Sequence, residues 1–128
     1  MQSRSGWRRS ISPSPACDAI EGAKLIIEQR DYHIHTGKLG EVVRLYEDEG
    51  IAIQQEILGN LLGWFTTDVG ALSTVVSMWG YTDGAARDER RARLQQDERW
   101  QQFVKKIQPL IHTQQNRILK PTSFSPIR

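Results

Sequence analysis

The chain has 128 residues, of which 25% are charged and 38% are hydrophobic, a length and composition typical of one globular domain. The net charge is +2, and three arginines lie near the N-terminus, so the remainder is close to neutral and lacks the concentrated basic face of a nucleic-acid-binding domain. A single cysteine, Cys17, excludes an internal disulfide, and no apolar run approaches the roughly 20 residues that span a bilayer.

Residues 1–23 are rich in Ser, Arg and Pro and contain no acid before Asp18. Such a segment buries too little apolar surface to offset its backbone entropy, so we predict a disordered basic tail before a domain over residues 24–128. Its composition fits a mitochondrial transit peptide. We prefer the alternative that the start codon is placed too far upstream.

The first half of the domain predicts a strand followed by helix. Residues 24–35 alternate, with Glu28, Arg30 and Tyr32 on one face. Thr36 is a candidate cap for a helix that begins at residue 39 and ends at Gly50, and residues 51–58 form a second helical stretch.

The second half predicts a hairpin, two helices and a last strand. Residues 61–67 and 73–81 are rich in strand-forming residues and flank a five-residue loop. Asp83 and Asp97 each precede a helical pattern as candidate caps, and Pro109 ends the second one. Residues 111–119 form the last strand and residues 121–128 an exposed end.

The order is therefore β-α-β-β-α-β, an α+β domain whose two helical connections cross the same face of a four-stranded antiparallel sheet. The third strand carries Val75 and Trp79 on one face and Val76 and Met78 on the other. A sheet that is apolar on both faces but helix-covered on only one needs a partner. The simplest partner is a second copy, so we expect a homodimer.

The ordered motifs along residues 26–128 resemble the NIPSNAP family. Single pieces are weak, but the series at near-fixed spacing is specific. The series comprises Glu28-x-Arg30-x-Tyr32, Gly37-Lys38, Leu61-x-Gly63-Trp64-Phe65-Thr66-Thr67, Gly70, Trp79-x-Tyr81, Arg87-x-x-Arg90-Arg91, Asp97-x-x-Trp100 and Asn116-Arg117-Ile118-Leu119-x-Pro121-x-x-Phe124-Ser125-Pro126.

The resemblance implies a ferredoxin-like fold paired into a dimeric α+β barrel. The wider superfamily includes cofactor-independent monooxygenases, haem-degrading enzymes and lactone isomerases, whereas NIPSNAP members mostly have no assigned activity. Eukaryotic members are mitochondrial, two-module proteins linked to vesicle trafficking and mitophagy. This single-module chain looks more like a bacterial member, so that role is not transferred. We expect a cytoplasmic protein, or a mitochondrial one if the tail is a transit peptide.

Arg30 is the first candidate site residue. A guanidinium flanked by Glu28 and Tyr32 can bind a carboxylate with two parallel hydrogen bonds. The alternative, which we place slightly ahead, is a Glu28–Arg30 pair that braces the sheet, with Arg117 as a candidate third member.

Aromatic and polar strand residues complete the candidate site. The aromatic sheet suits a flat organic ligand, although Trp64 and Trp100 are more typical of core or interface positions. Trp79 and Tyr81 remain open between these roles. Gln114, Asn116 and Arg117 are suited to line a cavity or to lie at the sheet edge. The candidate ligand-binding set is Arg30, Tyr32, Trp79, Tyr81, Gln114 and Arg117.

Two further clusters have simpler interpretations. His33 and His35 lie two apart with Asp31 between them, and His112 begins the last strand, but no fixed-spacing metal motif accompanies them, so we expect no metal and no cofactor. The run over residues 87–93 mixes both signs and is typical of a solvated helix face.

The leading hypothesis is a NIPSNAP-family homodimer of unassigned activity with a small-molecule pocket between sheet and helices. The ligand would be a small organic acid or an aromatic molecule. No Ser-His-Asp set, phosphate loop or zinc-helix motif occurs in the sequence. The alternatives are a cofactor-independent monooxygenase or isomerase, and a protein-interaction module.

Overall fold

The computed structural model describes residues 25–128, so the predicted tail over residues 1–23 lies outside the described residues. Four strands form one sheet in the order β2-β3-β1-β4, and every neighbouring pair is antiparallel. The strands are β1 (Ile26–Ile34), β2 (Asn60–Thr66), β3 (Thr74–Tyr81) and β4 (Ile111–Leu119). This confirms the predicted β-α-β-β-α-β order and the ferredoxin-like α+β fold.

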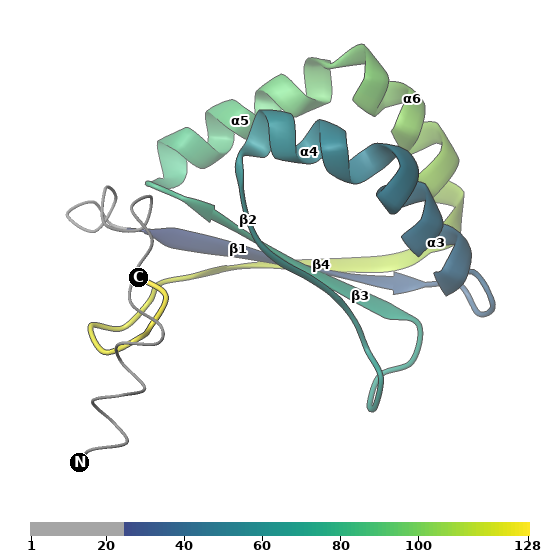
Figure 1. The fold of residues 1–128 in the computed structure, drawn as a ribbon, viewed down its shortest axis with the longest axis horizontal. Helices are drawn as coiled ribbons and strands as arrows, with labels where there is room; N and C mark the ends of the chain where they lie inside the picture. The colour runs from purple at the N-terminus through teal and green to yellow at the C-terminus, as the bar shows by residue number, and fades with distance from the viewer. Residues whose placement is uncertain (1–24) are drawn as a thin grey trace.

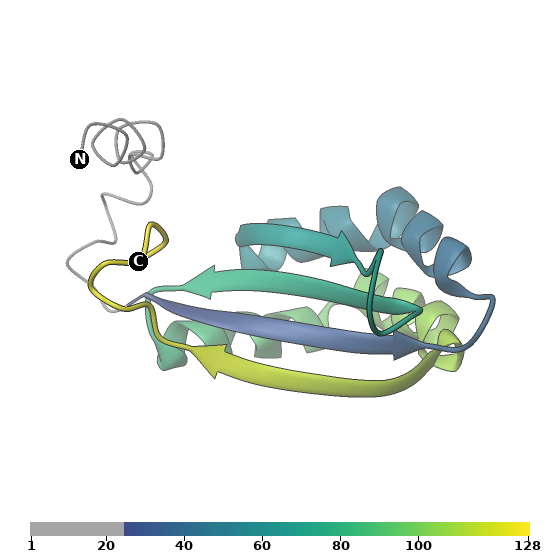
Figure 2. The same cartoon turned by 90° about the horizontal axis from the view of Figure 1, so that it is seen from below.

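Both helical connections lie on the same side of the sheet (Figure 1). The first contains α3 (Leu39–Leu45), a π-helical turn (Tyr46–Gly50) and α4 (Ile51–Leu58). The second contains α5 (Gly84–Gln96), α6 (Glu98–Ile107) and a 3-10 turn (Gln108–Leu110). Figure 2 shows the molecule from below, which is the side of the sheet opposite the helices, and no helix lies in front of the four strands. Within residues 25–128 no helix has the length and apolar character needed to cross a bilayer.

Two aspartates begin the helices of the second connection, as predicted. The Asp83 carboxylate accepts a hydrogen bond from the backbone N–H of Ala86 at 2.8 Å. The Asp97 carboxylate accepts from the backbone N–H groups of Arg99 and Trp100 at 2.9 and 3.2 Å. These bonds satisfy N–H groups that have no partner inside the helix.

The first connection differs from the prediction at both of its expected ends. Lys38, not Thr36, precedes α3, and no side chain caps it. Gly50 does not end the helix, because its φ of −70° is helical and the chain continues into α4. A side chain at this position would overlap the ring of Phe103, so glycine serves close packing rather than a turn. The helix ends at Gly59, where φ is +90°.

The two faces of the sheet have the predicted alternation. Tyr32 and Trp79 face the helices and belong to the buried core, together with Phe103 of α6. Val76 and Met78 lie on the open face and are only partly buried, and Phe65 is 53% exposed there. The helix-covered face therefore holds the core, while on the opposite face no helix of this chain covers Val76, Met78 and Phe65.

Candidate functional site

A buried carboxylate organises the polar groups between the sheet and α5. Glu28 of β1 is 0% exposed and accepts hydrogen bonds from Arg30 at 2.8 Å and from two nitrogens of Arg87 at 2.8 and 3.2 Å. Burial alone would raise the pKa of Glu28, but the Arg87 hydrogen bond and the nearby arginine charges outweigh burial and lower this pKa below its usual value. The predicted Glu28–Arg30 pair is confirmed, and its third member is Arg87.

Arg30 is almost fully enclosed by hydrogen-bonding groups. Its Nε donates to the Tyr32 hydroxyl at 2.9 Å, and its guanidinium lies 5.6 Å from the centre of the Tyr32 ring. With the Asn116 amide turned to suit its neighbours, the Asn116 oxygen accepts a hydrogen bond from Arg30 at 2.8 Å. Burial opposes the charge on Arg30, but Tyr32 and Glu28 outweigh burial and raise the pKa of Arg30. Arg30 is therefore charged and fixed in place.

Two donors beside this network lack an acceptor among the described residues. The Nη1 atom of Arg91 and the hydroxyl of Tyr81 are both buried without a hydrogen-bond partner. Burial, followed by the like charge of Arg30, lowers the pKa of Arg91, so the folded protein holds this charge at a cost. Burial also raises the pKa of Tyr81, which keeps its hydroxyl protonated and able to donate.

The cluster carries more positive than negative charge. Its three guanidinium groups belong to Arg30, Arg87 and Arg91. Its two carboxylates are the buried one of Glu28 and the exposed one of Asp88, which pairs with Arg87 at 3.1 Å. Buried charges are normally paired, and an unmet donor costs more than a hydrogen bond gains. An anion is the chemical group that would complete this arrangement.

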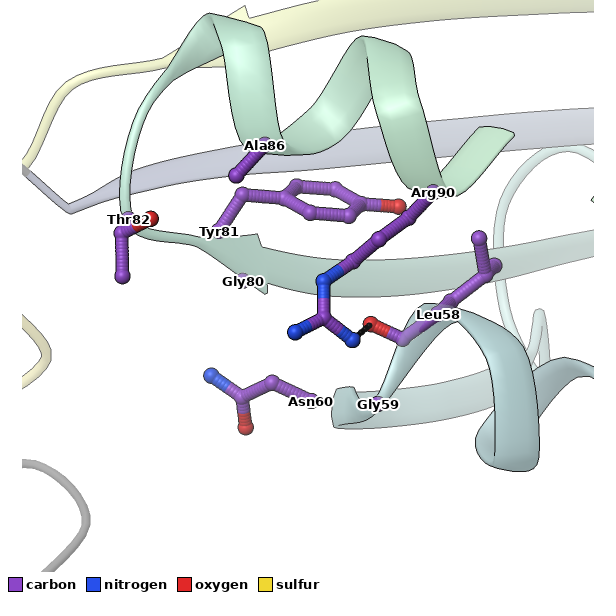
Figure 3. A pocket seen from close by; sticks show the side chains of 8 residues that line it. All are labelled: Leu58, Gly59, Asn60, Gly80, Tyr81, Thr82, Ala86 and Arg90. Carbon is purple, nitrogen blue, oxygen red and sulfur yellow. Dashed lines mark hydrogen bonds between the residues drawn. The ribbon is translucent and has the colours of Figure 1, made fainter. Parts of the chain in front are cut away.

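A cavity of about 400 Å³ adjoins the cluster at Tyr81 and lies where α4 ends and α5 begins (Figure 3). Its volume is within the range of small-molecule pockets. Arg90 projects into it, and no acidic residue lines it. The lining residues are Leu58, Gly59, Asn60, Gly80, Tyr81, Thr82, Ala86 and Arg90.

The predicted site residues separate into several environments. Of the four candidates on β1 and β3, Tyr81 is the one that lines the cavity. Trp79 is 0% exposed, and its Nε1 donates to the Ser77 hydroxyl at 3.3 Å. Trp79 is thus part of the core.

The candidates on β4 lie on opposite faces of the sheet. Gln114 pairs with Tyr32, so it is on the helix side, where it is exposed. Arg117 pairs with Gln29 and therefore points to the open face. The expectation that Arg117 joins Glu28 and Arg30 is wrong, because Asn116, one residue earlier, has the parity that reaches them.

The three histidines gather at the other end of β1. The ring of His112 lies 5.8 Å from that of His33 and 5.0 Å from that of His35, measured between ring centres, and all three residues are exposed. In the part of the chain that the structure describes, no group of His, Cys, Asp and Glu is arranged to bind a metal ion.

The arginines of α5 were missed as site residues because the run over residues 87–93 was interpreted as a solvated face. Arg87, Arg91 and Leu94 are spaced by four and three residues, which places them on one side of a helix. Leu94 is fully buried, so that side faces the sheet. The spacing to a buried leucine was the available signal, and the mixture of charges concealed it.

Solved structures with the same fold include close relatives from bacteria. A NIPSNAP family protein from Agrobacterium tumefaciens is 51% identical, with a TM-score of 0.81 over 83% of this chain and 93% of that chain. A NIPSNAP-like domain protein from Burkholderia xenovorans is 47% identical, with a TM-score of 0.79 over 81% of this chain and 90% of that chain. A more distant neighbour is a Nitrosomonas europaea protein, provisionally assigned as an antibiotic biosynthesis monooxygenase. It is 6% identical, with a TM-score of 0.59 over 80% of this chain and 95% of that chain. This likeness shows the fold alone.

Curated relatives are longer proteins. NipSnap homolog 1 of Danio rerio is 31% identical over 103 residues, which are 80% of this chain and 36% of that protein. The chain thus spans about a third of the length of the curated relatives it matches. The NIPSNAP family profile matches residues 27–126, which run from the second residue of β1 through the other three strands and both helical connections. Because this match covers most of the chain, the chain belongs to the NIPSNAP family.

Proposed function

We propose that this chain is a homodimeric small-molecule-binding protein that takes an organic anion in the space between the sheet and α5. The observation that carries the proposal is the excess of the arginine charge of Arg30, Arg87 and Arg91 over the two carboxylates of Glu28 and Asp88. Unmet donors on Arg91 and Tyr81 add to it.

An anion would relieve the cost that the cluster imposes on the free protein. Charge-assisted hydrogen bonds are about twice as strong as neutral ones, and their strength grows where water is excluded. Glu28 already accepts from Arg30 and Arg87, and the other acid of the cluster, Asp88, pairs with Arg87 at 3.1 Å. Neither of these acids accepts a hydrogen bond from Arg91, so the positive charge of Arg91 favours a negative group in the space beside it.

The homodimer is supported by the open face of the sheet. Phe65 is 53% exposed, and Val76 and Met78 lie beside it on the neighbouring strand. Apolar sheet surface of this kind requires cover, and a second copy provides an identical face. Two sheets packed in this way would form the dimeric α+β barrel. The bacterial relatives support a cytoplasmic location as part of the same proposal.

Native mass spectrometry of the freshly purified protein tests both parts together. We expect a dimer mass and, on gentle desolvation, a co-purified species that leaves on denaturation. A panel of organic acids should then raise the melting temperature of the emptied protein, whereas the corresponding neutral amides should not. A monomer at micromolar concentration would overturn the dimer, and equal responses to acids and amides would overturn the anion site.

A further inference from the structure

The Arg90 side chain is only loosely held in the cavity at the end of α4. Its Nη1 donates to the backbone carbonyl oxygens of Ile57 and Leu58 at 3.4 and 3.3 Å, which are long for hydrogen bonds. The other terminal nitrogen points away from Leu58 into the cavity (Figure 3). Arg90 therefore has donor capacity that faces open space.

Gly59 leaves room for this guanidinium. A Cβ atom built on Gly59 would lie 2.9 Å from Nη1 of Arg90, and the φ of +90° at Gly59 also disfavours any other residue. The backbone that ends α4 is thus shaped around the arginine, and the arginine in turn approaches the last carbonyl groups of the helix.

The remaining lining has a mixed character that limits the class of ligand. Leu58, Ala86 and the ring of Tyr81 offer apolar surface, while Asn60 and Thr82 supply neutral polar groups. With one arginine and no acid in the lining, the cavity suits a molecule with one negative group and an apolar body. Fully polar ions such as phosphate would leave the apolar wall unused.

We infer that this cavity holds the ligand, with its carboxylate on Arg90 and an aromatic or branched aliphatic body against Tyr81, Leu58 and Ala86. The inference rests on the proposed anion-binding function and adds the place, the direct partner and the chemical class. Behind Tyr81, the buried Arg30 and the half-buried Arg87 and Arg91 contribute a positive field rather than a direct contact.

Isothermal titration with benzoate, benzamide and acetate tests the ligand class. Benzamide has the shape of benzoate without the charge, and acetate has the charge without the ring. We expect benzoate to bind at least about tenfold more tightly than either, because it alone satisfies both Arg90 and the apolar wall.

Two matched pairs of variants test the location. Ala86→Leu fills the cavity, whereas Ala85→Leu makes the same change at an exposed neighbouring position of α5. Arg90→Gln removes the guanidinium, whereas Arg93→Gln removes an exposed one from the same helix. We expect Ala86→Leu and Arg90→Gln each to weaken benzoate binding by at least about tenfold and their controls to change it less than twofold.

The outcomes separate this inference from the proposed function. If Ala86→Leu and Arg90→Gln keep benzoate affinity while Arg91→Met abolishes it, the anion lies on the buried cluster and the cavity assignment is wrong. If neither benzoate nor any other carboxylate binds the wild-type protein, both the cavity assignment and the proposed function fail. Circular dichroism of each variant confirms that loss of binding is not loss of fold.

Discussion

Replacing Arg91 should make the ligand-free protein more stable. The folded protein buries Nη1 of Arg91 without an acceptor and places the charge near Arg30, and both effects lower the pKa of Arg91. Arg91→Met keeps a long unbranched side chain to pack against the core but removes the charge and the unmet donor.

The size of the effect follows from the cost of an unmet buried donor. That cost is about 1–3 kcal/mol, and methionine recovers part of it while losing the attraction of Arg91 to Glu28. We therefore expect the free energy of unfolding to rise by about 1 kcal/mol, which corresponds to roughly 4–8 °C in melting temperature for a domain of this size. Urea denaturation and differential scanning calorimetry of the ligand-free protein measure both quantities.

Arg87→Met is the matched control on the same helix. Arg87 donates two hydrogen bonds to Glu28, and these bonds, working against partial burial, raise the pKa of Arg87. Its loss should cost about 1.5–3 kcal/mol, the usual value for hydrogen bonds to a charged group. The two variants should therefore have opposite signs. If Arg91→Met destabilises the protein as much as Arg87→Met, Arg91 is a structural residue and the proposed anion site is wrong.

Three further changes test the fold and the dimer. Because the folded pKa of Glu28 is lowered, its pairing stabilises the protein fully above the unfolded pKa near 4.5, and this stabilisation is lost as the pH falls through the folded value. Glu28→Gln should cost about 3 kcal/mol at pH 7 and should reduce the loss of unfolding free energy at acid pH, measured by urea denaturation. An unchanged loss at acid pH would contradict the pairing. Gly50→Ala should cost about 1–3 kcal/mol because its Cβ overlaps the Phe103 ring, and Phe103→Leu in the same chain should recover part of that loss in chemical denaturation. Met78→Glu should give a folded monomer in sedimentation velocity, because it places a charge on the open sheet face; a persistent dimer would mean that another surface joins the copies.

The fold was predictable because strand alternation, helix caps and the order of the elements all indicate the same architecture. The strict alternation through Glu28, Arg30 and Tyr32 predicted which side chains share a face, and the capping aspartates marked the helix starts. Gly50 was misleading for a physical reason. Glycine serves both positive φ and close approach, and the sequence does not distinguish a turn from a position filled by the Phe103 ring.

The candidate site was only half predictable. The β1 members Arg30 and Tyr32 were identified because residues two apart in a strand lie on the same face. Arg87 lies 59 residues from Glu28 in sequence, and that contact depends on how α5 crosses the sheet. The choice between Asn116 and Arg117 depended on strand register, where a shift of one residue exchanges the two faces.

The packing of the first crossover against Phe103 of α6 also determines where the molecule can bend. Because the Phe103 ring fills the space beside Gly50, flexing the helix there would separate two packed surfaces. Gly59 is the first later position with a permissive backbone, and it borders the cavity that holds Arg90. Widening of the cavity mouth to admit a ligand should therefore be concentrated in the peptide bonds around Gly59, while α3, the π-helical turn and α4 keep their conformation.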